Sequence, residues 1–463
     1  MDDKYKMLIK NAGYLTISNF ASKILIFLLV PVYTSVLTKE EYGIFDAIVV
    51  AIQLVAPVVT LNIAEGAMRF LLDNKQDHNV VHTIGLRYIL LGISLIVFFG
   101  IFSIFVGRIP IIHGNEWFFL LYGAFYILNN YYIQYAKGIG KVSVMAIGGV
   151  IGTVSMLASN ILFLLVFKWG LSGFFAANTI GLAFPVVYYL FALRESNFKH
   201  CVTDKTLQKN MLLYSLPMVF NTIGWTINSS LDKYCLIALC GIDASGLVAI
   251  AYKIPTILSV VHAIFIQAWQ ITAVNAYETE NYKVFYSDTF IFSNAVAVFL
   301  CSGLIFGNKI LARILFSGVF FEAWKYVPFL LISVMFNQTA GFVGPLLAAK
   351  KESGAMAKAA IIGSIFNLAL NVVLIKLIGV QGAAIATAIS SFVIYFVRWW
   401  YARDLLESRI YPKLYGSWIL VSISALAEIL FNGCLVQIIV IVLLLRMHRV
   451  QICKIWRAVR KVK

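Results

Sequence analysis

Three lysines and one aspartate lie inside segments that are otherwise apolar. Lys23 occurs in SNFASKILIF, Asp232 and Lys233 in NTIGWTINSSLDKYCLI, and Lys253 in GLVAIAYKIP. A charge near the centre of a bilayer costs about 3 kcal/mol, so it normally faces a cavity or a partner. Adjacent helical residues point about 100° apart, so we expect Asp232 to pair with a cation such as Lys253, which leaves Lys233 available. The surplus of positive charge predicts a site for an anion, such as phosphate or pyrophosphate, lined by the three lysines and organised by Asp232. A purely structural ion pair is the alternative.

A second pair of charges occurs in AEGAMRF. Glu65 and Arg69 are four residues apart with the acid first, a spacing that favours an ion pair on one helix face. We expect the pair to act as a latch or a gate. Pro217, early in the segment that carries Asp232, could act as a hinge or as a static kink.

The elements that must position these residues are membrane helices. The chain has 463 residues, of which 61% are hydrophobic and 13% charged, against about 25% charged in soluble domains. Apolar segments near the length that spans a bilayer recur, which predicts an all-α integral membrane protein with about 14 transmembrane helices. The predicted spans are 11–37, 43–67, 82–106, 116–135, 144–167, 171–193, 211–239, 247–274, 286–307, 325–348, 356–376, 379–401, 414–431 and 433–448.

The net charge of +16 reflects membrane topology rather than nucleic-acid binding. With a cytoplasmic N-terminus, Lys and Arg accumulate on the inner side, so both termini are expected to be cytoplasmic. Asp46, Asp288 and Glu428 lie near helix ends and are expected to be solvated. The six cysteines form no metal-binding pattern, no phosphate-binding loop occurs, and no extramembrane segment is long enough for a catalytic domain. We therefore expect no cofactor, no metal site and no enzyme activity.

The sequence repeats itself weakly at a spacing of about 200 residues. Lys10-Asn11 resembles Lys209-Asn210, and Gly170-Leu-Ser-Gly173 resembles Gly379-Val-Gln-Gly382. We predict two six-helix lobes in a parallel pseudo-two-fold repeat, plus a C-terminal helix pair. The expected divisions are an N-terminal lobe 1–194, a cytoplasmic linker 195–210, a C-terminal lobe 211–403, a helix pair 404–448 and a basic cytoplasmic tail 449–463.

Several stretches in order resemble polysaccharide-transport flippases of the Wzx type, in the multidrug/oligosaccharidyl-lipid/polysaccharide exporter superfamily. They are NAGYLTISNFASKILIFLLVPVYTSVLTKEEYGIFD, AEGAMRF, SSLDKY, VAIAYKIP and IQAWQ. The resemblance implies two lobes that form a V around a cationic lumen, onto which Lys23, Lys233 and Lys253 map. It implies alternating-access translocation of undecaprenyl-pyrophosphate-linked repeat units for O-antigen, capsule or exopolysaccharide across the bacterial cytoplasmic membrane.

The resemblance also implies partners. These are the lipid-linked oligosaccharide, membrane lipid, a counter-ion (H⁺ or Na⁺), and a polysaccharide polymerase with its chain-length regulator. Asp232 and Glu65 are the acids placed for ion coupling. Candidate sugar contacts are Asn19, Asn228, Gln267 and Trp269. A lipid II-type flippase or a multidrug cation extruder of the same fold remains the alternative.

Overall fold

The protein is all-helical in every part of the chain that the computed structural model describes, namely residues 27–72, 77–106, 114–193, 204–277, 280–350, 352–431 and 433–449. It divides into two compact units, residues 1–230 and 231–463. The division falls inside one long helix, α10 (Lys205–Cys240). The predicted lobe and linker boundaries stay predictions.

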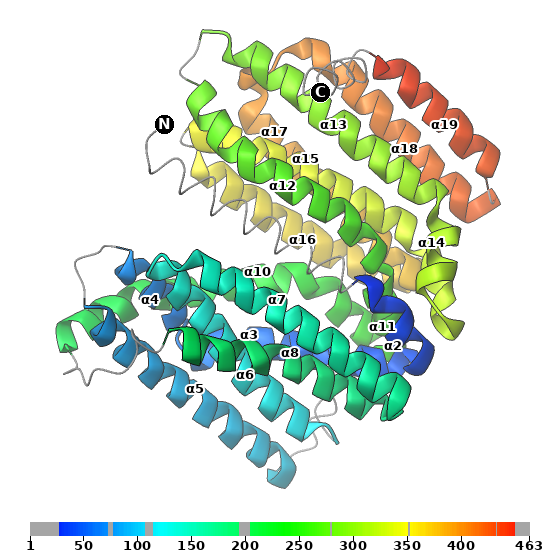
Figure 1. Ribbon diagram of the computed structural model, residues 1–463. Coiled ribbons are helices and arrows are strands. Elements are labelled where there is room, and N and C mark those ends of the chain that lie inside the picture. Colours follow the sequence, from blue (N-terminus) through cyan, green and yellow to red (C-terminus); the bar gives the residue numbers. More distant parts are fainter. Residues whose placement is uncertain are drawn as a thin grey trace, which may run out of the picture. The chain divides into compact units, whose positions relative to one another are not determined.

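Helices α2 to α8 belong to the first unit, together with the first part of α10 (Figure 1). Two aromatic rings stack at its core, Phe118 of α6 on Phe175 of α8, with centroids 3.9 Å apart. Gly148 of α7 lies against Tyr189 of α8, where a β-carbon would come within 2.2 Å of the phenol oxygen. The helices are α2 (Val30–Val36), α3 (Lys39–Val59), α4 (Ile63–Leu71), α5 (His78–Val106), α6 (Glu116–Gly138), α7 (Val142–Asn160), the π-helix η1 (Ile161–Val166) and α8 (Gly170–Ala192).

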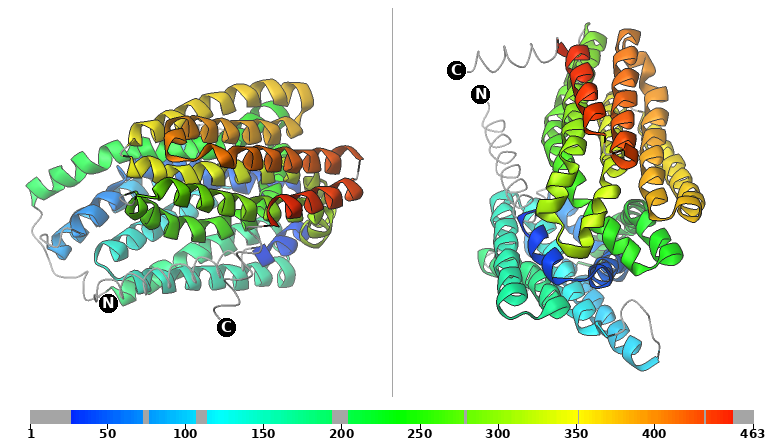
Figure 2. Two further views of the ribbon diagram at one scale, coloured as in Figure 1. Left: turned by 90° about the horizontal axis from the view of Figure 1, so that it is seen from above. Right: turned by 90° about the vertical axis from the view of Figure 1, so that its right-hand side faces the viewer.

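The second unit is built around α15, which packs against α12 and α17. The α18 and α19 helices run side by side in the views of Figure 2. The elements are α11 (Ile242–Ala251), α12 (Lys253–Ala276), α13 (Tyr282–Phe306), α14 (Asn308–Leu315), η2 (Gly318–Lys325), α15 (Val327–Ala349), α16 (Ser353–Ile378), α17 (Val380–Ala402), η3 (Arg403–Leu405), η4 (Ser408–Ile410), α18 (Tyr411–Phe431) and α19 (Cys434–Met447).

The predicted span 43–67 is wrong as a single helix. A capping box between Thr38 and Glu41 starts α3, as the sequence T-K-E-E favours. The helix then stops at Val59, and α4 begins at Ile63. The amide of Asn62 donates to the Pro57 carbonyl, and the amide of residue 61 donates to the carbonyl of residue 58. This is the Schellman pattern that closes a helix C-terminus.

A second break separates α11 from α12, whose axes differ by 43°. Pro255 causes it, because proline has no amide hydrogen to donate to the carbonyl four residues earlier, that of Ala251, and its ring crowds that carbonyl. Tyr252 and Lys253 therefore lie at a bend within the predicted span 247–274.

Among the described residues, nine helices are long and apolar enough to cross a membrane, or ten if the bent pair α11–α12 is one span. This confirms a multi-pass helical membrane protein, while the count of 14 and the two-lobe repeat stay predictions. Neither α6 nor α10 is among the nine.

The expectation that Glu428 is solvated is wrong, because this residue is only 5% exposed. It accepts a hydrogen bond from Gln437, and Lys309 lies 3.7 Å away. The acid is buried because α18 and α19 pack against each other around it. Asp288, by contrast, forms an exposed ion pair with Arg409 at 3.1 Å.

Candidate functional site

Asp232 is a buried acid, 4% exposed, and two hydroxyl groups donate hydrogen bonds to it. The Oη of Tyr252 lies 2.8 Å from Asp232 Oδ2, and the Oγ1 of Thr387 lies 3.1 Å from the same oxygen. A buried carboxylate needs such donors, because each unpaired polar atom away from water costs free energy. Asp232 therefore ties together α10, the α11–α12 bend and α17.

The two hydroxyls are not equivalent. Tyr252 has its single proton directed at Asp232. The hydroxyl of Thr387 also lies 2.9 Å from the carbonyl oxygen of Ala383, one turn earlier in α17. A hydroxyl carries only one proton, so Thr387 shares its proton between the two acceptors. Tyr252 is the stronger partner of the acid.

The predicted cations flank this cluster in the sequence. Lys233 follows Asp232 on α10, and Lys253 follows Tyr252 as the first residue of α12. Both are half-buried. The partner that the sequence proposed for Asp232, Lys253, stays a prediction, and the two hydroxyl partners were not foreseen.

Glu65 lies in the first turn of α4 and Arg69 in its last turn. This arrangement suits the helix dipole, which favours an acid at the N-terminus and a base at the C-terminus. The Nε2 of Gln134, on α6, donates to Glu65 Oε1 at 2.5 Å. Arg69 is exposed, and its predicted ion pair with Glu65 stays a prediction.

The other predicted site residues divide between described and undescribed positions. Trp269 is 3% exposed, and its indole Nε1 donates to the Phe342 carbonyl at 2.9 Å, while its ring stacks on that of Phe342 with centroids 4.4 Å apart. These contacts make it a packing residue in α12, and its sugar contact stays a prediction. Pro217 is exposed within a continuous α10. Lys23 and Asn19 lie outside the described residues, as do the side chains of Asn228 and Gln267.

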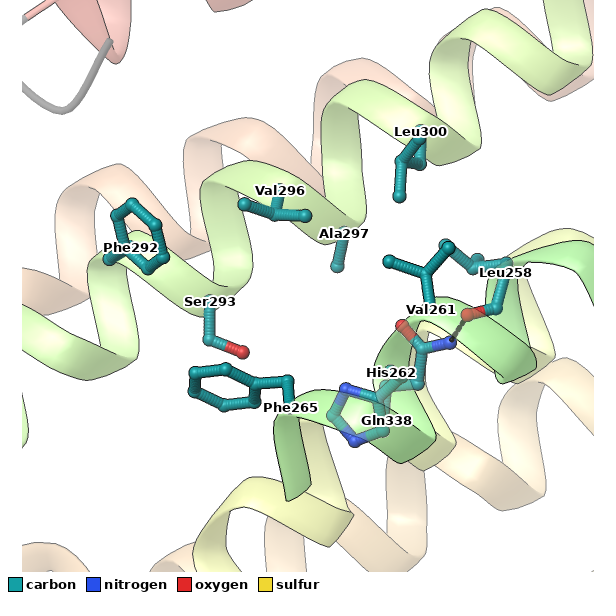
Figure 3. Close-up of a pocket in the computed structure, with 10 residues that line it drawn as sticks. All are labelled: Leu258, Val261, His262, Phe265, Phe292, Ser293, Val296, Ala297, Leu300 and Gln338. Carbon is teal, nitrogen blue, oxygen red and sulfur yellow. Dashed lines mark hydrogen bonds between the residues drawn. The ribbon is translucent and has the colours of Figure 1, made fainter. Parts of the chain in front are cut away.

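Figure 3 shows a pocket of about 120 Å³ between α12 and α13. His262 and Gln338 lie close together at one side of it, and the amide of Gln338 donates to the Leu258 carbonyl at 2.8 Å. Ser293 is the third polar residue of a lining that is otherwise apolar. Neither Lys233 nor Lys253 is among the described residues that line this pocket, and these lining residues offer little to hold an anion.

Sequence reasoning missed Tyr252, Thr387 and Gln134. Tyr252 lies inside VAIAYKIP, where its charged neighbour Lys253 is the more conspicuous residue and a tyrosine gives no signal of its own. Gln134 had a usable signal, since an amide in a helix packed among apolar residues needs a partner. Thr387 had none, because the contact spans 155 residues of sequence.

The fold is that of an all-helical, multi-pass membrane protein. The structure resembles the lipid II flippase MurJ in its inward closed conformation, with a TM-score of 0.68 and 17% identity, over 96% of this chain and 98% of that one. It also resembles the inward-facing conformation of a multidrug resistance MATE family transporter of the MOP superfamily, with a TM-score of 0.65 and 13% identity, over 86% of this chain and 98% of that one. At these identities the likeness shows the fold alone.

The family follows from the sequence match. The family model described as "Polysaccharide biosynthesis protein" matches residues 8–271, so the chain belongs to this family. This confirms the family that the sequence resemblance indicated.

Two curated relatives match part of the chain. An uncharacterized membrane protein of Methanocaldococcus jannaschii is 23% identical over 250 residues, covering 52% of this chain and 48% of that protein. A protein of Haloferax volcanii named "Probable low-salt glycan biosynthesis flippase" is 25% identical over 264 residues, covering 56% and 53%. The chain thus spans about half the length of the curated relatives it matches.

Proposed function

We propose that the protein is a flippase for lipid-linked glycans, carrying an undecaprenyl-pyrophosphate-linked oligosaccharide across the membrane by alternating access. One observation carries the proposal. The family match over residues 8–271 includes all three intramembrane lysines, within a fold like that of a lipid II flippase. Lys23, Lys233 and Lys253 hold the pyrophosphate, since a lysine ammonium binds phosphate as a compact point charge.

Asp232 organises this cationic site and is the residue proposed to couple transport to H⁺ or Na⁺. Support comes from its burial together with its hydroxyl donors, because a carboxylate in a membrane interior is costly and is usually functional. Glu65 is the second acid proposed for coupling. O-antigen, capsule or exopolysaccharide precursors are the substrates proposed, at the bacterial cytoplasmic membrane.

Reconstituted full-length protein tests the proposal. Liposomes carry undecaprenyl pyrophosphate with a fluorescent oligosaccharide, and a membrane-impermeant quencher reports what has crossed. Lys233→Ala and Lys253→Ala are expected to slow translocation at least 10-fold each, because a hydrogen bond to a charged group contributes about 1.5–3 kcal/mol. Lys23→Ala should do the same.

Lys283→Ala is the matched control, since Lys283 is exposed at the start of α13 and should leave the rate unchanged. The proposal fails if all three intramembrane variants translocate the lipid at the rate of the unsubstituted protein. Transport of a cationic dye, without transport of the pyrophosphoryl lipid, would favour a multidrug extruder instead.

A further inference from the structure

A polar cavity lies in the first unit where α3 stops and α4 begins. Its volume is about 90 Å³, and no Lys, Arg, Asp or Glu among the described residues lines it. The lining combines side-chain amides, hydroxyls and one aromatic ring. These polar members are Gln53, Thr60, Asn62, Tyr126, Asn130, Thr222 and Thr226.

Two amides in this lining have unused hydrogen-bonding capacity. Within the part of the chain that the structure describes, the side chains of Gln53 and Asn130 form no hydrogen bond. Each carries two donor hydrogens and an acceptor oxygen. Asn130 is exposed, so the cavity can admit a ligand from outside.

A third group in the lining with hydrogen-bonding capacity is the hydroxyl of Thr222, which Asn62 holds in place. Its Nδ2 donates to the Oγ1 of Thr222 at 3.0 Å, so the Thr222 hydroxyl serves as an acceptor there and keeps its own proton to donate. Asn62 has a φ of 50°, a left-handed conformation that asparagine tolerates better than most residues. The helix break thereby aims a side chain across the cavity at α10.

The volume of the cavity and the polar groups that line it determine which class of ligand fits. At the roughly 30 Å³ that a water takes in the liquid, the cavity holds about three waters. That is room for two or three hydroxyl groups, or one acetamido group, but not for a whole oligosaccharide. Without a cation among the described lining residues, the cavity cannot compensate the charge of a pyrophosphate, whereas its amides and hydroxyls match both the donors and the acceptors on a sugar ring edge.

We propose that this cavity is a sugar subsite that holds the hydroxyl or acetamido edge of one ring of the lipid-linked glycan. The inference rests on the proposed function, because it assumes that the glycan enters the molecule. Tyr126, Asn130 and Gln134 recur every four residues and so share one face of α6. The subsite therefore lies on the same helix face as the amide that binds Glu65, one or two turns away.

Binding of defined lipids to the full-length protein in nanodiscs tests the subsite. The probes are undecaprenyl pyrophosphate carrying one glucose, the same lipid carrying one N-acetylglucosamine, and the bare lipid. The unsubstituted protein is expected to bind at least one sugar-bearing lipid more tightly than the bare lipid. Gln53→Leu and Thr222→Val should each weaken that binding about five-fold, the loss of one neutral hydrogen bond, and leave the bare lipid unaffected.

Two further variants separate the missing contact from misfolding. Thr222→Ser keeps the hydroxyl and should restore binding. Thr83→Val removes a hydroxyl whose hydrogen bond, in the described part of the chain, stays within α5 and goes to the Asn79 carbonyl. This variant should change the binding of neither kind of lipid. The inference is overturned if no sugar-bearing lipid is preferred, or if the variants weaken both kinds of lipid equally or neither. Failure of the unsubstituted protein to bind any of the three lipids would instead overturn the proposed function.

Discussion

Removing the Tyr252 hydroxyl should destabilise the protein, and the whole effect should come from the hydrogen bond that Asp232 loses. Tyr252→Phe keeps the ring and deletes the donor that lies 2.8 Å from Asp232 Oδ2. Hydrogen bonds to charged groups contribute about 1.5–3 kcal/mol, so we expect a loss of about 2 kcal/mol, roughly 30-fold in the folding equilibrium. Thr387→Val should cost about half as much, because Thr387 shares its proton with the Ala383 carbonyl.

A double-mutant cycle isolates the interaction. Asp232→Leu removes the acceptor and leaves the Tyr252 hydroxyl without its partner, so it should also destabilise the protein by itself. In that background Tyr252→Phe should cost almost nothing, which gives a coupling free energy of about 2 kcal/mol. The stability of each variant is measured on purified protein in mixed micelles. Dodecyl sulfate is added stepwise, and tryptophan fluorescence reports the folded fraction.

Thr289→Val is the control for the threonine substitution. The hydroxyl of Thr289 donates to the Phe285 carbonyl of its own helix, as that of Thr387 does to the Ala383 carbonyl. Among the described residues, Thr289 forms no hydrogen bond with an acid. The reasoning is refuted if Tyr252→Phe costs the same with and without Asp232, since the hydroxyl would then be stabilising something else.

Three further predictions concern the first unit and the packing of both units. Gln134→Leu should cost about 2 kcal/mol in the same unfolding titration, because it leaves the half-buried Glu65 without its amide donor; an unchanged midpoint would show that water replaces the amide. Gly148→Ala should destabilise by about 1–3 kcal/mol through overpacking, whereas Gly303→Ala, which meets nothing within 4 Å, should stabilise by about 0.5–1 kcal/mol; comparing their unfolding midpoints tests the sign. Asn62→Gly should be more stable than Asn62→Ala by about 1 kcal/mol, because both lose the amide but only glycine adopts the left-handed backbone freely; equal midpoints would contradict this.

The sequence predicted the helices because lipid imposes a simple rule, that each crossing segment is long and apolar. It could not predict the end of α3, because the glycine that usually follows the end of a helix is missing there. At the end of α6 the Schellman pattern has Gly140 in the left-handed position, with a φ of 73°, as expected. At the end of α3 that position is held by Leu61, with a φ of 50°, which sequence patterns do not anticipate.

The sequence indicated Asp232 as a candidate site residue, but it did not indicate the two hydroxyl groups that donate to this acid. Asp232 stood out because an acid in an apolar helix is rare. Its donors did not, since a tyrosine and a threonine occur commonly in membrane helices and only tertiary packing selects them. Charge alone suggests a lysine as the partner of a buried acid, and it gives no indication of the two neutral hydroxyl donors.

The hydrogen bond between Thr387 and Asp232 joins residues far apart in the sequence, and this separation has a consequence for biosynthesis. Ribosomes add about 5–20 residues per second, so Tyr252 emerges within a few seconds of Asp232, whereas Thr387, 155 residues later, follows after roughly 8–30 s. In the meantime α10 carries an acid with only one of its two hydroxyl donors. The nascent chain therefore has an interval in which chaperones or the insertion machinery can still rearrange α10, and arrival of α17 closes it.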